Sequence, residues 1–485
     1  MTYQIKTSSL PRLAAALLVL ISIAMIGGCA NYAGIYSNKQ MAIPSSFATT
    51  RSLPAESGPW PSAEWAEKFG GAQLTALIDE ALKGSPTLEM ARARLAAAAA
   101  ASEGATANTL PRVSAGASVE RQRFTGNGLV PPPYAGSWQT ENNALVSASY
   151  DLDLWGKNRE ALKSAVSTLR ASEAETAEVE LTLSIAIARD YNELARLYAL
   201  HDIATRNVAQ RQRVLRLTMV RVKMGLDTEV EQRAAEADVA SAQVAVAEWN
   251  GDIRRVRYQL GALLGKGPDR GLAIARPQPG ADKPARLPEN LPADLVSRRP
   301  DIVAARWRVE ATIHHIAIAK AEFFPDINLG AMVGLSSLGF SHFLSLSSRS
   351  ADVGPAIHLP IFDGGALRAQ LKGRYAAFNY AVANYNRTLL NALSQVAIRL
   401  SEIRAIDNQL QASVRAQDAI HEALQLALAQ YKAGLTTQLT VLNAQHAALA
   451  SDQQVVNLRL ARRDRQIALV AALGGGYHEA QPSTP

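Results

Sequence analysis

Four segments of the chain alternate apolar and polar residues with the period of two that is typical of β-strands. In the first segment, apolar residues from Val113 to Val119 share one face, and the positions between them are polar or glycine. The four strands are expected at about residues 111–125, 139–155, 325–337 and 351–363. Each segment is long enough to cross a bilayer as a tilted strand, which takes roughly nine to eleven residues.

The segments beside these strands lack the period of two and are expected to be helices. They cover about residues 86–108, 157–223, 227–264, 300–322, 366–432 and 436–473. Pro86 and Pro300 suit the first position of a helix, because the N–H group that proline lacks has no helical partner there. The two longest segments contain no proline. Each is therefore expected to run unbroken for roughly 100 Å, at about 1.5 Å per residue.

The order of these elements occurs twice, which indicates an internally duplicated chain. The pair Gly225-Leu226 recurs as Gly434-Leu435, 209 residues later. The expected domains are two copies at residues 61–265 and 299–474, a proline-rich connector at 266–298 and a C-terminal tail at 475–485. The prolines of the connector prevent a continuous helix from crossing it.

The only cysteine of the chain, Cys29, follows an uncharged apolar run near the N-terminus. That run, Leu13–Ile26, is about 21 Å long as a helix, which is too short for a permanent anchor but typical of a signal peptide. The four residues that end at Cys29 (IGGC) resemble a bacterial lipobox. This resemblance implies a signal peptide at residues 1–28 and a segment at 29–60 that is anchored through S-diacylglycerol and N-acyl lipid on Cys29. Ala30, in place of aspartate, favours the outer membrane. The alternative is an ordinary signal peptide with an incidental cysteine.

Composition and charge exclude several classes of partner and structure. The formal net charge of +7 is small for 485 residues and no dense basic block is present, so no nucleic-acid partner is expected. A lone cysteine cannot form an intramolecular disulfide, so stability must come from packing. Beyond the signal segment, no uncharged apolar run approaches 18 residues. Any passage through a membrane must therefore use strands.

Four strands are too few to close a membrane barrel, because the smallest use about eight. Unpaired strand edges in lipid would leave backbone amides and carbonyls without hydrogen bonds. Several copies of the chain would therefore have to combine their strands. A half-buried sheet in the aqueous periplasm gives the same alternation and is the alternative interpretation.

Several motifs in combination resemble TolC-type outer-membrane efflux proteins, in their NodT-like lipoprotein branch. The motifs are LPADLVSRRPDI (291–302), FPDI (324–327), YDLDLWGK (150–157), PIFDGG (360–365), YKAGL (431–435) and VLNAQ (441–445). The resemblance implies an α+β fold in which a homotrimer forms a 12-stranded transmembrane β-barrel, with four strands per chain. This barrel would continue into a 12-helix periplasmic α-barrel.

The same resemblance implies the function of a passive exit duct for drugs or other small toxic compounds in the outer membrane of a Gram-negative bacterium. Its partners would be outer-membrane lipid, a periplasmic adaptor protein and an inner-membrane pump of the RND, MFS or ABC type. No enzymatic activity is expected, and no cofactor other than the covalent lipid.

The resemblance also assigns roles to the turns between the long helices. Family members contact the adaptor at these turns, which here contain Gly225, Leu226, Gly434 and Leu435. Each glycine is also expected to end a helix, because glycine readily adopts the positive φ of a C-terminal cap.

The family narrows the periplasmic end of its tunnel with a ring of carboxylates, and here the chain departs from the family pattern. Thr440 and Asn443 stand at positions where carboxylates are common. Three neutral amides would attract cations less strongly than three carboxylates would. Asp227, Glu229 and Glu231 in the first turn are the alternative source of negative charge.

An enzyme, a non-conducting lipid-anchored stalk and the outer-membrane channel of a type I protein secretion system are the remaining alternatives. His421-Glu422 begins like the helix of a zinc protease, but Gln425 replaces the second histidine ligand. His314 and His315 point about 100° apart on a helix and form a poor pair of metal ligands. No metal site is therefore expected. Conductance would distinguish a channel from a stalk.

Overall fold

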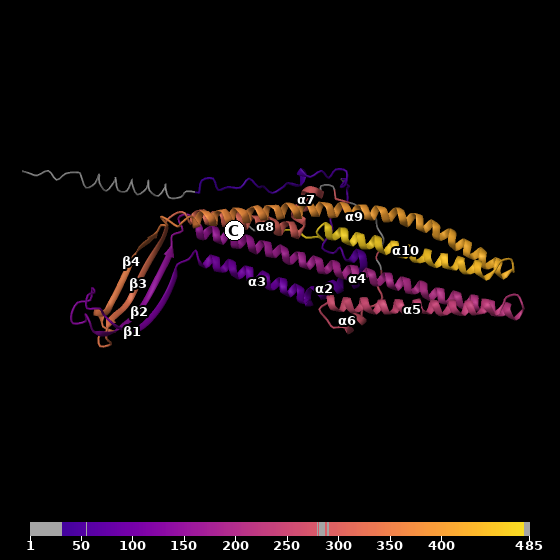
Figure 1. The fold of residues 1–485 in the computed structure, drawn as a ribbon, viewed down its shortest axis with the longest axis horizontal. Helices are drawn as coiled ribbons and strands as arrows, with labels where there is room; N and C mark the ends of the chain where they lie inside the picture. Colours follow the sequence, from indigo (N-terminus) through magenta and orange to yellow (C-terminus); the bar gives the residue numbers. More distant parts are fainter. Residues whose placement is uncertain (1–31, 55, 279, 281–286, 289–290, 480–485) are drawn as a thin grey trace, which may run out of the picture. The chain divides into compact units, whose positions relative to one another are not determined.

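The computed structural model describes residues 32–54, 56–278, 280, 287–288 and 291–479. In chain order they form η1 (Pro44–Ser46), α2 (Glu67–Gly84), α3 (Pro86–Ala107), β1 (Arg112–Arg123), β2 (Trp138–Asp151), α4 (Lys157–Lys223), α5 (Glu229–Leu263), α6 (Pro268–Leu272), α7 (Leu291–Arg298), α8 (Pro300–Ala321), β3 (Asp326–Leu338), η2 (Leu346–Ser348), β4 (Arg349–His358), α9 (Ala366–Lys432) and α10 (Gln438–Ala472) (Figure 1). The expected signal peptide at 1–28 and the lipid site Cys29 lie outside the described residues, as does the end of the expected tail.

The described residues divide into two compact units. The first unit contains residues 32–41, 96–171 and 306–384, and the second contains the remainder. The first therefore holds the strands, and the second holds the turns that follow the two long helices. None of the helices in the described part of the chain combines the length and the apolar character needed to span a membrane.

The four strands of the first unit form one antiparallel sheet in the order β1-β2-β3-β4. The register aligns Val113 with Ala148, Ala148 with Ala331 and Ala331 with Val353. These residues share a face, because residues paired across antiparallel strands point to the same side. The pairing of β2 with β3 joins the two copies of the duplicated chain into one sheet.

The apolar face of this sheet is exposed within the chain. Val113 is 70% exposed, Val333 is 59% exposed and Val353 is 84% exposed. A continuous apolar surface of this kind marks an interface with lipid or protein. A half-buried sheet would have this face covered by the chain itself, so the exposure argues against that alternative.

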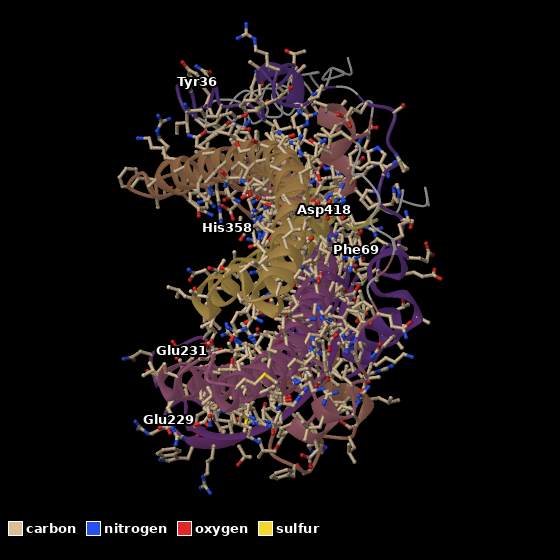
Figure 2. All side chains as sticks on the ribbon, turned by 90° about the vertical axis from the view of Figure 1, so that its right-hand side faces the viewer. Tyr36, Phe69, Glu229, Glu231, His358 and Asp418 are labelled. Carbon is tan, nitrogen blue, oxygen red and sulfur yellow. The ribbon has the colours of Figure 1, made fainter. Side chains whose placement is uncertain are left out.

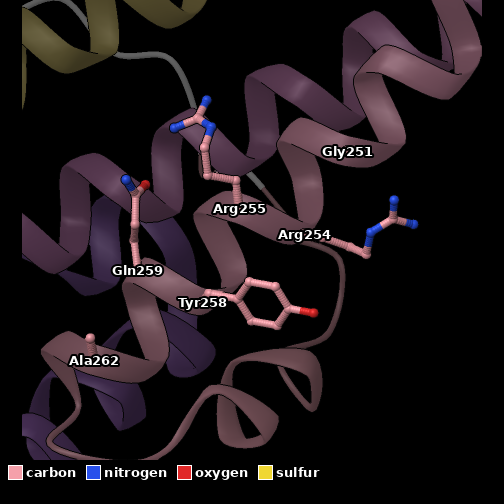
Figure 3. A pocket seen from close by; sticks show the side chains of 6 residues that line it. All are labelled: Gly251, Arg254, Arg255, Tyr258, Gln259 and Ala262. Carbon is pink, nitrogen blue, oxygen red and sulfur yellow. The ribbon is translucent and has the colours of Figure 1, made fainter.

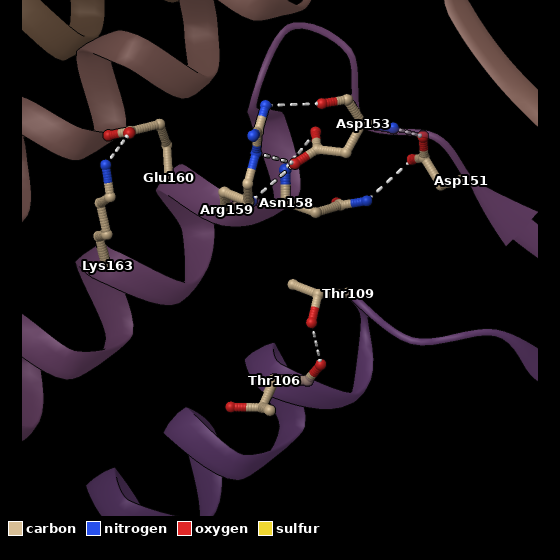
Figure 4. A network of polar contacts seen from close by, with 8 residues as sticks. All are labelled: Thr106, Thr109, Asp151, Asp153, Asn158, Arg159, Glu160 and Lys163. Atoms are coloured by element: carbon tan, nitrogen blue, oxygen red, sulfur yellow. Dashed lines mark hydrogen bonds and ion pairs between the residues drawn. The ribbon is translucent and has the colours of Figure 1, made fainter. Parts of the chain in front are cut away.

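The second strand ends at Asp151 rather than at the expected residue 155, because its acidic residues turn to cap the next helix (Figure 4). Asp151 accepts a hydrogen bond of 2.9 Å from the backbone N–H of Asp153. The Asp153 carboxylate in turn accepts bonds of 2.9 Å from the N–H groups of Asn158 and Arg159 at the start of α4. These carboxylates satisfy backbone donors that a helix start leaves free.

The fourth strand ends at His358 rather than at 363. Pro360 has no N–H group to continue the strand pairing. Asp363 accepts bonds of 2.8 Å and 2.6 Å from the backbone N–H groups of Gly365 and Leu367, so it caps α9. The other strands match the expected ranges to within two residues at each end.

The second unit contains two helical hairpins, one made by most of α4 with α5 and one made by most of α9 with α10 (Figure 1). α4 and α9 have the expected bounds. α5 and α10 begin two residues later than expected, because Thr228 and Thr437 adopt the extended conformation of an N-cap. Thr228 forms a capping box with Glu231.

Helix α2 was not expected from the sequence, although its buried residues Leu74, Leu77, Ile78 and Ala81 repeat with helical spacing. It contributes to the main apolar core of the second unit, together with residues of α4, α5 and α10. α4 and α10 are also joined by polar contacts: Asn192 donates a bond of 2.9 Å to the Leu460 carbonyl. This core supports the hairpins that carry the candidate site.

Candidate functional site

The turns of the two hairpins have the same backbone structure. Gly225 and Gly434 both adopt positive φ, at 72° and 77°. In the first turn, Leu226 N–H donates to the Arg221 carbonyl at 2.9 Å, and in the second, Leu435 N–H donates to the Gln430 carbonyl at 2.9 Å. Together with a second bond from each glycine, these contacts form the Schellman motif that ends a helix at glycine.

Both turns present apolar side chains to solvent. Leu226 is 60% exposed and Leu435 is 79% exposed, and Met224, Val230 and Leu439 beside them are exposed as well. Large apolar side chains gathered at an exposed turn are typical of protein contact sites. The residues expected to contact an adaptor therefore lie at an accessible surface of this unit.

An ion pair lies directly behind the first turn. Arg221 near the end of α4 donates two hydrogen bonds to the Asp227 carboxylate. Its Nε atom donates to Oδ2 at 2.8 Å, and its Nη2 atom donates to Oδ1 at 3.1 Å. The side chains of both residues are about nine-tenths buried. Such a bidentate pair fixes the geometry of both side chains.

Tyr431 of α9 connects this ion pair to the other hairpin. Its hydroxyl donates a hydrogen bond of 2.7 Å to Asp227 Oδ2, and its carbonyl accepts one of 3.2 Å from Arg221. The Arg221 guanidinium also lies 4.6 Å from the centre of the Tyr431 ring, within the range of a cation–π contact. One tyrosine thus holds the first turn against the end of the second long helix.

Two further buried polar residues, Thr218 and Gln438, extend the contact between the two hairpins. The fully buried Thr218 hydroxyl lies 3.3 Å from the Tyr431 hydroxyl. Gln438, at the start of α10, donates bonds of 3.3 Å to Thr218 and to the Glu231 carbonyl. We call Thr218, Arg221, Asp227, Tyr431 and Gln438 the turn network.

The turn network sets the charge of its members. The bonds from Arg221 and, to a lesser extent, Tyr431 hold the pKa of the Asp227 carboxyl below its usual range, against the opposing effect of burial. Burial raises the pKa of the Tyr431 phenol. At neutral pH the network therefore contains an ionised aspartate and a neutral tyrosine.

The residues expected at the aperture lie outside this network. Thr440 and Asn443 are exposed on the first turns of α10. Thr440 accepts a bond of 2.9 Å from the Thr436 hydroxyl, and the Asn443 side chain has no partner among the described residues.

The acidic residues of the first turn differ in their interactions. Asp227 is paired with Arg221, and Glu231 caps its own helix by accepting a bond of 2.9 Å from the Thr228 N–H. Glu229 is exposed on the same turn of α5 (Figure 2). Glu229 has no side-chain hydrogen bond in the described part of the chain, but it interacts electrostatically with Arg233.

The sequence interpretation missed Thr218, Arg221 and Gln438, and it assigned no role to Tyr431. A signal was present in the comparison of the two copies. At the positions that correspond by the offset of 209 residues, Arg221 is matched by Gln430 and Asp227 by Thr436. Polar residues that differ between otherwise matching turns are candidates for contacts between the copies.

The histidine pairs considered as metal ligands have other partners. The Nδ1 atom of His314 lies 2.6 Å from a Glu160 carboxylate oxygen, and Nε2 of His421 lies 2.7 Å from Asp452 Oδ1. No group of three or more metal-ligating side chains occurs among the described residues.

Comparison with known proteins gives a consistent family assignment. A sequence model of the outer membrane efflux protein family matches residues 77–266 and 291–475. MdtP of Shigella flexneri, named a multidrug resistance outer membrane protein, is 30% identical over 476 residues, which covers 95% of this chain and 96% of that protein. FusA of Burkholderia cepacia, named a fusaric acid resistance protein, is 37% identical over 327 residues, which covers 67% of this chain and 62% of that protein.

A solved structure extends the likeness to the fold. The crystal structure of the outer membrane protein VceC of Vibrio cholerae matches with a TM-score of 0.80 and 35% identity, and the match covers 86% of this chain and all of that one. The two chains therefore share their fold over most of their length.

Proposed function

Because the chain belongs to the outer membrane efflux protein family, we propose that three copies of it form a passive exit duct for small toxic compounds. The duct would receive its cargo from an inner-membrane pump through a periplasmic adaptor. Family membership confirms the expected α+β fold, the outer-membrane location and the role in efflux. The family consists of channels rather than enzymes, and we propose no catalytic role for this chain.

The exposed apolar face of the sheet is the observation that carries this proposal, because a face of this kind can lie against lipid. A sheet in lipid must also have its edges paired, and β1 and β4 each have one edge without a partner strand among the described residues. In lipid, such edges leave backbone groups unsatisfied at several kcal/mol each. Pairing β4 of one copy with β1 of the next removes these edges, and three copies with four strands each would give 12 strands.

The two hairpin turns support the proposed adaptor contact. Leu226 and Leu435 are exposed on turns of identical backbone structure. Three copies would present six such turns, alternately from the first and second half of the chain. The turn network would hold the two turns of one chain in a fixed arrangement for docking.

The names of the relatives support a cargo of small organic compounds. MdtP is named for multidrug resistance and FusA for resistance to fusaric acid. We propose that the cargo of this chain includes antimicrobial drugs and organic acids. The pump, whether of the RND, MFS or ABC type, would select among them. Covalent lipid on Cys29 would add an anchor in the outer membrane.

Two measurements test the proposal together. Purified protein added to planar bilayers is expected to give stable single-channel conductance, and chemical cross-linking is expected to give trimers. Deletion of the gene is expected to raise intracellular accumulation of exported drugs, and the intact gene should restore export. A protein that stays monomeric in lipid and does not conduct would overturn the proposal.

A further inference from the structure

We propose that a cavity between α4, α9 and α10 in the second unit is a binding site for a small organic anion with an apolar body. The cavity has a volume of about 590 Å³, which lies within the range of sites for small molecules. The side chains that line it come from α4 of the first hairpin and from both helices of the second.

A buried amide without a partner lines this cavity. Gln445 of α10 is 2% exposed, and neither its Nε2 nor its Oε1 atom has a hydrogen-bond partner among the described residues. Leaving a buried amide unsatisfied costs stability, so most buried polar groups in folded proteins are paired. The carboxylate of a bound anion would accept a hydrogen bond from the Nε2 atom.

The charges at the cavity favour an anion. Arg206, Arg213 and Lys432 line it, and none of the three has a hydrogen bond or ion pair with its side chain in the described part of the chain. The one carboxylate in the lining, Asp452, already accepts bonds of 2.7 Å from Gln417 and His421. The lining therefore carries three cations without side-chain partners in the described part of the chain, and a carboxylate that is already hydrogen-bonded.

The floor of the cavity is apolar. Val214 and Leu424 are nearly fully buried, and Leu428 beside them belongs to the apolar cluster around Tyr431. A carboxylate would lie toward the cations, and an alkyl or aromatic body would contact these side chains. Sites of this composition bind through apolar burial and use a few polar groups for orientation.

The depression along α5 lacks these features (Figure 3). Its lining, which includes Arg254, Tyr258 and Gln259, comes from α5 alone. Arg255, also on its edge, is paired with Asp252. One helix face cannot surround a ligand, so this depression is not a matching site.

Binding of fusaric acid to the purified full-length protein tests the proposal. This compound is an aromatic carboxylic acid with a butyl chain, and its methyl ester is the uncharged control. Isothermal titration calorimetry in detergent, with empty micelles as the blank, is expected to show saturable binding of the acid. The ester is expected to bind at least about tenfold more weakly, because it cannot pair with the cations.

Variants locate the site. Gln445→Leu and Arg213→Gln are each expected to weaken binding of the acid about tenfold, while trimers form as in the wild type. Lys432→Gln provides a third lining variant in case one of the others fails to fold. Arg216→Gln removes an exposed charge from the same helix outside the cavity, so it should leave the affinity unchanged.

Three results would overturn the proposal: no saturable binding to the wild type, equal binding of acid and ester, or an equal loss in Arg216→Gln and Arg213→Gln. The site rests on the proposed function for the class of compound that it binds, but binding is measured on the purified protein without pump or adaptor. Absence of binding to the wild type together with normal export would therefore refute this site alone, and absence of conductance together with normal binding would refute the duct alone.

Discussion

The hydroxyl group of Tyr431 donates a hydrogen bond of 2.7 Å to Asp227 Oδ2, across a separation of 204 residues. Tyr431 lies in the last turn of the long helix of the second copy, and Asp227 follows the long helix of the first. The bond therefore links corresponding ends of the duplicated chain. Because Arg221 binds the same carboxylate and contacts the same ring, movement of one turn relative to the other must break several contacts at once.

Removal of the Tyr431 hydroxyl is expected to loosen both turns. Tyr431→Phe should lower the local free energy of opening by about 1–2 kcal/mol, because one bond to a charged acceptor is lost. Asp227→Ala should cost about 3–5 kcal/mol, because it leaves Arg221 buried without its partner. Hydrogen exchange of the amides in residues 221–231 and 431–441 measures both effects.

Tyr258→Phe is the matched control for this experiment. Tyr258 lies on the exposed surface of α5, and its hydroxyl has no hydrogen-bond partner in the described part of the chain. Its removal should change exchange by less than about 0.5 kcal/mol. Equal effects of Tyr431→Phe and Tyr258→Phe would show that the turn network does not hold the turns.

The stability of the turns is expected to depend on pH. The pKa of Asp227 is lowered in the folded chain, so its contribution is complete above about pH 4 and is lost as the pH falls through the folded value. The pKa of Tyr431 is raised, so its contribution is complete below about pH 10 and is lost at higher pH.

Protection factors from hydrogen exchange, which are corrected for the intrinsic exchange rate, test this dependence. The difference between wild type and Asp227→Asn should be large at pH 7 and shrink toward zero as the pH approaches 2. A difference that stays constant from pH 7 to pH 2 would contradict the ionised pair.

Bulky residues at both turn glycines are expected to abolish export while trimers still reach the outer membrane. At Gly225 and Gly434 an added Cβ would meet no atom within 4 Å, so the cost of substitution is backbone strain of about 1–2 kcal/mol at each positive φ. The double Phe variant should therefore fold but present an altered contact surface. Drug accumulation and outer-membrane content are the measurements.

The double Asn variant at the same positions controls for the backbone. Asparagine accommodates positive φ better than other non-glycine residues and adds a small side chain. It should form trimers and retain most export. Normal export by the double Phe variant would refute the assignment of these turns as adaptor contacts.

Introduction of a carboxylate at the proposed aperture is expected to raise cation selectivity. Asn443→Asp would add three negative charges to a trimer at one level of the channel. Reversal potentials in single-channel recordings under a salt gradient measure the change. Gln454→Glu adds the same charge about three turns further along the same face of α10, and should have a smaller effect. Unchanged selectivity in Asn443→Asp would exclude that residue from the aperture.

Lipid attachment at Cys29 is expected from the lipobox alone. Cells grown with labelled palmitate should incorporate label into the wild-type protein but not into Cys29→Ser. Absence of label from the wild type would favour an ordinary signal peptide.

The sequence predicted those parts of the site that depend on neighbouring residues. The glycines at 225 and 434 end their helices as expected, because glycine adopts positive φ at low cost. The late starts of α5 and α10 were not predicted, since Asp227 and Thr436 could each have begun a helix. Asp227 and Thr436 lie outside the helices because the next residues, Thr228 and Thr437, have the extended backbone of an N-cap.

The contacts between the copies were beyond such local patterns. Tyr431 and Arg221 are ordinary residues of long helices in the sequence, and Gln445 is a polar residue in a helix with many others. Arg221 and Tyr431 are distinguished by their contact with each other across 210 residues, and Gln445 is distinguished by its burial without a hydrogen-bond partner among the described residues.

The sequence by itself determined the alternating strands, the duplication, the long helices and the positions of the turns, because period, proline and glycine act over a few residues. The tertiary structure alone decided the pairing of β2 with β3, the turn network and the cavity at Gln445. These depend on which distant segments pack together, and that choice is made by the summed burial of many side chains rather than by any local pattern.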